Sequence, residues 1–288
     1  MPGRSREMEV MMDAARSAAA GLLSRFRDRD SLTVCEKGPA NFVSTADLES
    51  DRLLRELLLG TFPTFGYVSE ESAPVESSES NSCFVVDPLD GTTNFLWGIP
   101  HFAVSVALVR DGRPVAGVVF DPAKDEMFTA ELGRGAWLDS KPMRVSSDGD
   151  LAHALIATGI PHAHSRLPHE PYLAMLRPAM RAAAGIRRLG AAALDLAYVA
   201  AGRYSVFFEQ GLYAWDTAAG VLLVTEAGGV VSDISGGTTF LQSGRVLATN
   251  GRLHRSMLSM FASARRTHVH PRRVPATPRQ SRGTRGRA

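Results

Sequence analysis

The stretch from Cys83 to Phe95 places the tightest constraint on this chain, because a buried strand leads there into a turn rich in carboxylate and hydroxyl groups. Its first four residues form a short apolar run with β-branched members, which predicts a buried strand, and Pro88 favours extended geometry in the residue before it. The strand therefore brings Asp87 to its end. Asp90 follows three residues later across a tight turn, and two carboxylates at this spacing suit a hard cation such as Mg²⁺.

The residues after the second aspartate favour an anion site. Gly91 lets the backbone approach a ligand closely. Thr92, Thr93 and Asn94 are typical of a capped helix start, whose free amide groups attract phosphate. One short stretch thus predicts a metal site beside an anion site.

Two alternatives compete with this interpretation. A bare D-x-x-D-G pattern is most often an acidic surface turn. The buried strand before it, the helix start after it and the matching acidic motifs elsewhere in the chain argue for a site. Phosphatases of the haloacid-dehalogenase type carry D-x-D-G-T after a strand. Here Pro88 stands two residues before Asp90, so the nucleophile-plus-acid pair of those enzymes is missing.

Charge is distributed unevenly along the 288 residues, although 32 basic and 30 acidic side chains nearly balance. Residues 265–288 carry eight arginines and no acid, which leaves 24 basic against 30 acidic residues in the body. The body is therefore not expected to bind polyanions, and the tail is expected to be disordered.

The cysteines and the hydropathy pattern favour a cytoplasmic protein. Cys35 and Cys83 lack the C-x-x-C spacing of a metal or redox pair, so we expect reduced thiols in or near the core. No apolar run approaches the roughly 18 residues needed to span a membrane, and the first twelve residues lack the apolar core of a signal peptide.

Hydrophobic periodicity predicts an α/β protein with two lobes, at about 1–150 and 151–264. In the first lobe we expect helices over 5–26 and from Ser44 or Thr45 to about Gly60. Strands are expected at 31–34, 67–68, 83–86, 101–109, 114–120 and 126–131, with a loop over 73–82. In the second lobe we expect strands at 154–158, 204–208, near Val230 and near Val246, and helices after Arg187, from Trp215 and over 252–264. Histidines 162, 164 and 169 invite a zinc interpretation, but their pattern favours a solvated loop.

Three motifs occur in order: Ser69-Glu70-Glu71-Ser72, then Asp87 to Asn94, then Trp215-Asp216-Thr217-Ala218-Ala219-Gly220. Together they resemble the inositol monophosphatase family, the Mg²⁺-dependent phosphomonoesterases of lithium-sensitive type, over roughly residues 8–263. The resemblance implies a layered α-β-α-β-α sandwich of the sugar-phosphatase type with two fused lobes. It also implies a homodimer and two or three Mg²⁺ ions per site.

The resemblance also implies a role for each matching residue. The metal ligands would be Glu70, Asp87, the Leu89 carbonyl, Asp90 and Asp216. Gly91, Thr92 and Thr93 would hold the phosphate, and Ala192, Glu209 and Asp216 would face the sugar or cyclitol. Asp47 would support Thr92.

Three positions depart from the family pattern. Ser69 replaces the usual Gly before the Glu pair, Asn41 stands where Asp is common, and Ala191 stands where Ser or Thr is frequent. The first two are expected to alter loop geometry. The third removes a hydroxyl from the substrate pocket and leaves substrate identity open.

Four carboxylates in one pocket would repel a phosphate, so we expect a metal to be obligatory. Glu70 with Thr92 would orient and deprotonate a water that attacks phosphorus directly, and no Ser, Cys or His is placed to form a phosphoenzyme. Thr93 stands where relatives acting on histidinol or nucleotide phosphates commonly carry Lys, which favours inositol 1-phosphate or a similar polyol phosphate. Histidinol phosphate, fructose 1,6-bisphosphate and nucleotide-like phosphates remain alternatives, as does an RNA- or transcription-associated role for the tail.

Overall fold

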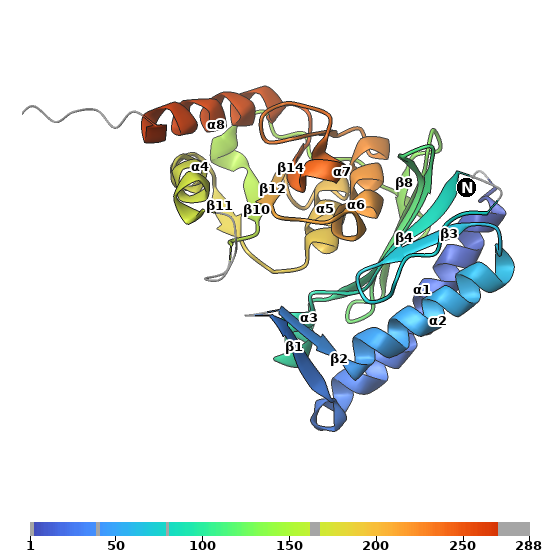
Figure 1. Ribbon diagram of the computed structural model, residues 1–288. Coiled ribbons are helices and arrows are strands. Elements are labelled where there is room, and N and C mark those ends of the chain that lie inside the picture. Colours follow the sequence, from blue (N-terminus) through green and yellow to red (C-terminus); the bar gives the residue numbers. More distant parts are fainter. Residues whose placement is uncertain (1–2, 39–40, 79–80, 162–167, 270–288) are drawn as a thin grey trace, which may run out of the picture.

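The computed structural model describes residues 3–38, 41–78, 81–161 and 168–269, and it stacks helices and sheets in five alternating layers. Figure 1 shows α1 and α2 on one side of the molecule and α4 and α8 on the other, with α5 and α6 between the sheets. Each layer buries its apolar face against the next, as amphipathic elements must. The predicted α-β-α-β-α sandwich is confirmed.

The elements have the following bounds. The α-helices are α1 Arg6–Arg27, α2 Thr45–Thr61, α3 Thr92–Leu96, α4 His169–Ala182, α5 Ala192–Ala200, α6 Ala214–Glu226, α7 Phe240–Ser243 and α8 His254–Val269. The strands are β1 Val34–Gly38, β2 Asn41–Ser44, β3 Gly66–Ser69, β4 Ser82–Asp90, β5 Ala103–Arg110, β6 Arg113–Asp121, β7 Glu126–Glu131, β8 Ala136–Leu138, β9 Lys141–Pro142, β10 Leu155–Thr158, β11 Gly185–Arg187, β12 Val206–Gln210, β13 Val230–Ser232 and β14 Arg245–Thr249. Two short 3₁₀ turns lie at Arg29–Ser31 and Leu151–His153.

The first sheet has seven strands in the order β3-β4-β5-β6-β7-β8-β9. β3 runs parallel to β4, and the remaining pairs are antiparallel. Residues alternate between its two faces, so Phe84 and Val86 pack toward α1 and α2 while Val85 packs toward the middle layer. The predicted helices 5–26 and 45–60 are confirmed to within a residue at each end.

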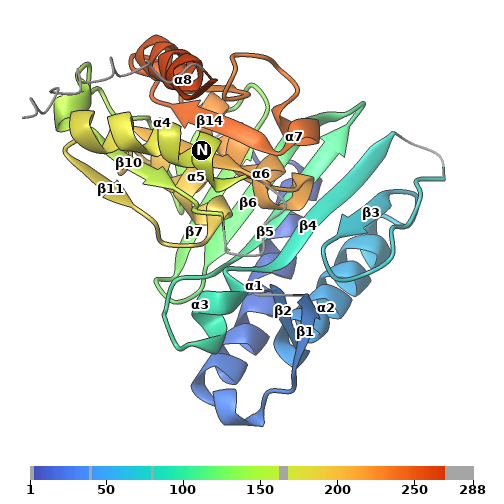
Figure 2. The ribbon, with the colours of Figure 1, turned by 60° about the vertical axis from the view of Figure 1, so that its left-hand side comes forward.

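The second sheet has the order β11-β10-β12-β14-β13. β10 is parallel to β11 and β12, and β14 is antiparallel to both of its neighbours. Helices α4 and α8 pack on its outer face around Tyr172, Phe208 and Phe261. Figure 2 shows these two helices above the sheet, on the side remote from α1 and α2.

The middle layer explains how the two sheets become one body. All nine residues of α5 are buried, and so is the run Thr217–Val224 of α6. Helices that are apolar on all sides belong inside a protein. Gly220 allows α6 to approach α5 closely, because a Cβ there would lie 2.5 Å from the Cβ of Leu196.

Several sequence predictions are corrected by the structure. The strand predicted at 31–34 begins only at Val34. Cys35 is exposed rather than near the core, while Cys83 is half-buried. Within the loop predicted over 73–82, Val75 pairs with Tyr67 of β3 through two backbone hydrogen bonds, and Ser82 already belongs to β4.

The predictions for the second half of the chain also need adjustment. Helix α4 was not predicted at all. Helix α8 continues to Val269 rather than ending near 264, so the first five residues of the predicted tail are helical. Residues 270–288 and the histidines 162 and 164 lie outside the described residues, whereas His169 begins α4.

Candidate metal centre

The predicted strand-turn-helix stretch forms the centre of the site. β4 continues through Asp87 to Asp90, but its register against β5 shifts between these two residues. Such an irregularity turns side chains away from the strict alternation of a strand. Asp87 is 2% exposed, and one of its oxygens accepts the Leu89 backbone N–H at 3.0 Å. The buried strand prediction is therefore confirmed, with a bulge in place of the expected tight turn.

Three carboxylates from three different elements converge at this point. Glu70 follows β3, Asp87 lies in β4, and Asp216 lies in the first turn of α6. One oxygen from each lies within 4.8 Å of the others. β3 and β4 are parallel neighbours with Ser69 opposite Val86, so the next residue on each strand reaches the same edge of the sheet.

The local structure of α6 fixes the third carboxylate. Asp216 is the third residue of the helix, and its Oδ2 accepts the backbone N–H of Tyr213 at 2.7 Å. The Tyr213 ring stacks on Trp215, with centroids 4.7 Å apart. An acid at this position is stabilised by the helix dipole as well as by the capping hydrogen bond.

The electrostatics of this group favour a cation. Burial raises the pKa of Asp87 well above its usual value, and the charges of Glu70, Asp90 and Asp216 raise it further. Burial likewise raises the pKa of Asp216 well above normal, against the hydrogen bond from Tyr213. Like charges held this close destabilise each other unless a cation screens them. The all-oxygen donor set therefore fits a hard divalent ion.

Asp90 is placed differently from the other three predicted carboxylate ligands. Its Oδ2 accepts the backbone N–H of Ala193 at 2.8 Å, at the start of α5. Burial raises its pKa to about 6, while the α5 amide groups act in the opposite direction. Asp90 is close enough to influence the charge of Asp87 but lies outside the 4.8 Å cluster. Its carboxylate thus joins the first sheet to the middle layer.

The predicted anion site lies next to Asp90. Gly91 has a φ of 92°, in the left-handed region, and a Cβ there would lie 3.1 Å from the His101 carbonyl oxygen. The Thr92 hydroxyl lies 3.1 Å from both the Asp47 carboxylate and the Leu89 carbonyl oxygen and can donate to either. Thr93 is exposed. The expected support of Thr92 by Asp47 is therefore present as a hydrogen bond.

Asp47 is fixed by its own helix. It is the third residue of α2, and its Oδ2 accepts the backbone N–H and the hydroxyl of Ser44 at 2.8 and 2.7 Å. Burial raises the pKa of Asp47, and the hydrogen bonds from Ser44 and Thr92 oppose that rise.

Glu209 and Ala192 form the side of the site that belongs to the second sheet and α5. Glu209 lies near the end of β12, where burial raises its pKa to about 8 despite the opposing charge of Arg188. Its carboxyl group lies directly against Gly159, at the end of the neighbouring strand β10. Ala192 is the buried first residue of α5.

Sequence reasoning missed two further acids near the site. Asp195 is 1% exposed in α5, and its Oδ1 has no hydrogen-bond partner in the described structure. Burial, Glu209 and Asp90 raise its pKa well above normal. Asp51 of α2 is buried and bonds to β3. Two features of the sequence could have indicated these acids. Asp195 is an acid within an otherwise apolar helix, and Asp51 stands one helical turn after Asp47.

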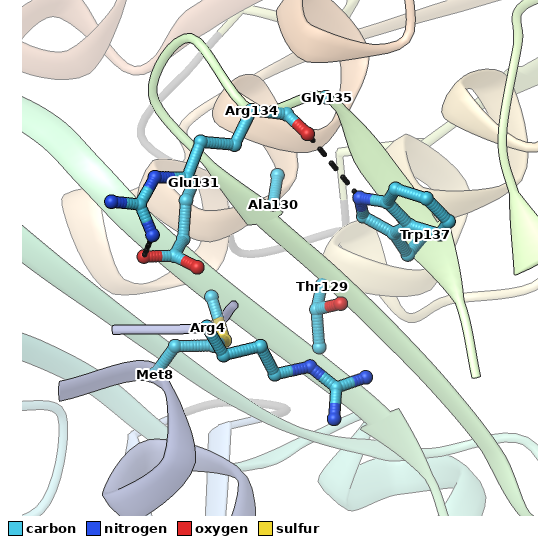
Figure 3. Close-up of a pocket in the computed structure, with 8 residues that line it drawn as sticks. All are labelled: Arg4, Met8, Thr129, Ala130, Glu131, Arg134, Gly135 and Trp137. Carbon is cyan, nitrogen blue, oxygen red and sulfur yellow. Dashed lines mark hydrogen bonds and ion pairs between the residues drawn. The ribbon is translucent and has the colours of Figure 1, made fainter. Parts of the chain in front are cut away.

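The cavity in Figure 3 is not this site. It lies between α1, β7 and β8, with a volume of about 20 Å³, and none of the carboxylates described above lines it. That volume holds about one water molecule. Its lining residues form a local contact in which Arg134 binds Glu131 and the Arg134 carbonyl accepts the Trp137 indole N–H.

Comparison with known proteins agrees with the three motifs. A model of the inositol monophosphatase family matches residues 4–270. Inositol-1-monophosphatase of Rhizobium meliloti is 47% identical over 254 residues, which cover 88% of this chain and 95% of that protein. Nus factor SuhB of Pseudomonas aeruginosa is 43% identical over 255 residues, covering 88% and 94%. The crystal structure of extragenic suppressor protein suhB from Bartonella henselae superimposes with a TM-score of 0.87 at 45% identity, covering 89% of this chain and 98% of that one. The chain therefore belongs to the inositol monophosphatase family.

Proposed function

We propose that this chain is a Mg²⁺-dependent phosphatase that hydrolyses inositol 1-phosphate, or a similar polyol phosphate, to the alcohol and inorganic phosphate. The observation that carries the proposal is the convergence of Glu70, Asp87 and Asp216 beside a glycine-threonine turn. The family membership and the 47% identical inositol-1-monophosphatase support the same activity.

The predicted ligands divide into two groups. Glu70, Asp87 and the Leu89 carbonyl would hold one ion, and Asp87, Asp90 and Asp216 a second, so that Asp87 serves both. Two or three ions would occupy the site in the working enzyme. Bound divalent cations would neutralise the carboxylates, act as Lewis acids toward the phosphate and lower the pKa of water.

The remaining residues bind and orient the reactants. Gly91, Thr92 and Thr93 would bind the phosphate through backbone amides and hydroxyls. Glu70 would accept the proton of the attacking water, and the Thr92 hydroxyl, aligned by Asp47, would orient that water. In-line attack would break the P–O bond to the alcohol, and the alkoxide would leave on the side that faces Asp216, Ala192 and Glu209 and take up a proton from water to give the alcohol.

Substrate choice rests on the wall opposite the phosphate. Glu209 presents a carboxyl group to that side, and on the phosphate side Thr93 stands where relatives acting on histidinol or nucleotide phosphates commonly carry Lys. Both features favour a leaving group rich in hydroxyls. Histidinol phosphate, fructose 1,6-bisphosphate and nucleotide-like phosphates are the alternatives to be compared.

We also propose a homodimer in the cytoplasm. Trp97, Ile99 and Leu189 are large apolar side chains with 64%, 49% and 37% exposure, and Asn94 of α3 donates to the Leu189 carbonyl, which brings the two segments together. Exposed apolar groups of this kind favour a protein partner. Among the described residues no helix is long and apolar enough to cross a membrane.

The direct test measures phosphate release from inositol 1-phosphate, with fructose 1,6-bisphosphate and histidinol phosphate in parallel, across a Mg²⁺ titration from zero. We expect turnover to require Mg²⁺ and to favour inositol 1-phosphate. The control is Asp87→Asn, which removes a charge from the carboxylate shared by both ions and should abolish turnover. Equal activity without divalent metal would refute the proposal.

A second role is favoured by the relatives named Nus factor SuhB. In this alternative the protein acts as an RNA- or transcription-associated partner, with the arginine-rich tail contacting phosphates. Eight arginines without acids would give binding that weakens steeply with salt. The test is RNA binding by the full chain and by a chain ending at residue 269, which lacks six of the eight arginines and keeps the whole of α8. Equal RNA binding by the two forms would show that residues 270–288 do not contribute to RNA binding.

A further inference from the structure

One face of α2 contacts three segments of the site. Asp47, Ser50 and Asp51 lie three and four residues apart, so they share a face of the helix, and all three are buried. Asp47 bonds to Thr92, and the Ser50 hydroxyl donates to the Pro88 carbonyl at 2.9 Å. Asp51 reaches the end of β3. The helix therefore contacts every chain segment that the first sheet contributes to the site.

The Asp51 contact concerns the segment that carries Glu70. Its Oδ1 accepts the Ser69 hydroxyl at 2.5 Å and the Tyr67 hydroxyl at 2.9 Å. The Ser69 hydroxyl oxygen also accepts the backbone N–H of Glu71 at 3.3 Å. The chain is thus held on both sides of Glu70, at the point where β3 ends.

The burial of these groups makes the link energetically significant. Asp51, Ser69 and Tyr67 are 4%, 6% and 0% exposed. A buried polar group left without a partner costs more than a hydrogen bond between exposed groups contributes, so each partner restrains the others. A glycine at position 69, as in the family pattern, has no side chain with which to make this link.

We propose that Asp51 and Ser69 are positioning residues that fix the direction of the Glu70 carboxylate toward Asp87 and Asp216. The inference rests on the proposed function, because it assumes that Glu70 binds a metal. Neither residue touches the reactants. They act by holding the backbone from which Glu70 extends, as residues behind metal ligands commonly do.

The test compares Ser69→Ala, Ser69→Thr and a matched control, Ser205→Ala. Ser205 is also buried, at 2% exposure, and donates to a carboxylate, that of Asp148, at 2.6 Å. The control therefore loses a hydrogen bond from a buried serine hydroxyl to a carboxylate, here a part-buried one, outside the set of predicted metal ligands. Titration calorimetry measures Mg²⁺ binding to each full-length protein, and denaturant titration in EDTA measures its free energy of unfolding. Phosphate release from inositol 1-phosphate at saturating Mg²⁺ gives kcat and KM.

We expect Ser69→Ala to raise the Mg²⁺ dissociation constant by about 10-fold or more, the lower end for residues behind metal ligands. Ser69→Thr keeps the hydroxyl and should restore binding to within a few fold. Ser205→Ala should lose comparable stability yet bind Mg²⁺ like the wild type. Wild-type Mg²⁺ affinity in Ser69→Ala would overturn the inference, as would equal weakening in Ser205→Ala. Failure of the wild type to bind Mg²⁺ would instead refute the proposed function.

Discussion

The contact between Gly159 and Glu209 leads to a sharp prediction about substrate choice. A Cβ added at Gly159 would lie 1.7 Å from Oε1, 1.9 Å from Cδ and 2.3 Å from Oε2 of Glu209. Carbon atoms in ordinary contact are about 3.5–4.0 Å apart, so Gly159→Ala must displace the whole carboxyl group by roughly 1.5–2 Å. The backbone itself tolerates alanine, because Gly159 does not have a positive φ.

The displacement should change the free energy of unfolding little but weaken recognition of the substrate. Glu209 can turn away from Gly159, and if it is held about 30° off a staggered rotamer the strain is about 0.5–1.5 kcal/mol. Because burial raises the pKa of Glu209 to about 8, the group is protonated at neutral pH. A hydrogen bond between this neutral carboxyl group and a substrate hydroxyl contributes about 0.5–1.5 kcal/mol, which corresponds to a loss in kcat/KM of roughly 2- to 12-fold. The free energy of unfolding should therefore change little while the kcat/KM for inositol 1-phosphate falls.

The assay compares inositol 1-phosphate with 4-nitrophenyl phosphate, whose leaving group carries no hydroxyls to bind. Gly159→Ala should lower kcat/KM for the first substrate and leave the second within a few fold. Gly149→Ala is the matched control, because a Cβ at that position meets nothing within 4 Å. An unchanged kcat/KM for inositol 1-phosphate would refute the role of Glu209, and an equal loss for both substrates would show general damage to the site.

Three further predictions concern charge in the site. Mg²⁺ at 100 times its dissociation constant should raise the free energy of unfolding by about 2.7 kcal/mol, and EDTA should reverse this in a denaturant titration. In EDTA, folded Glu209 keeps its proton to a pKa of about 8 whereas the unfolded chain loses it near the ordinary 4.5, so stability should fall between these pH values. Glu209→Gln should flatten that part of the profile, and an unchanged slope would contradict the assignment. Asp90→Asn and Asp90→Ala should both lose turnover, but the alanine variant should be about 1–3 kcal/mol less stable, because only asparagine keeps an acceptor for the Ala193 N–H.

The sequence predicted those parts of the site that a short run of neighbouring residues encodes. An apolar run followed by carboxylates and a glycine predicts a strand, its end and a turn, and parallel pairing then places Glu70 beside Asp87. Asp216 was assigned only through the resemblance, because no periodicity relates α6 to β4. The Asp51–Ser69 link joins residues 18 positions apart and leaves no repeating pattern. Helix α4 was missed because Pro178, in its interior, interrupts an otherwise helical pattern.

Asp90 lies near Asp87 and also accepts a hydrogen bond from α5, and neither the spacing nor the motif predicted this second contact. The contact shows what the layered fold contributes to the site. Glu70 and Asp87 come from the first sheet, Asp216 comes from the middle layer, and Asp90 ties the two layers together through α5. The carboxylate charges therefore oppose the packing that creates the site, since Asp216 joins Glu70 and Asp87 only when the layers close. A bound cation attracts all of these carboxylates, so that bringing them together then stabilises the fold. Metal binding and closure of the layers should accordingly be linked, with each favouring the other. The carboxylates that destabilise the fold without metal are the same groups that provide its affinity for the metal.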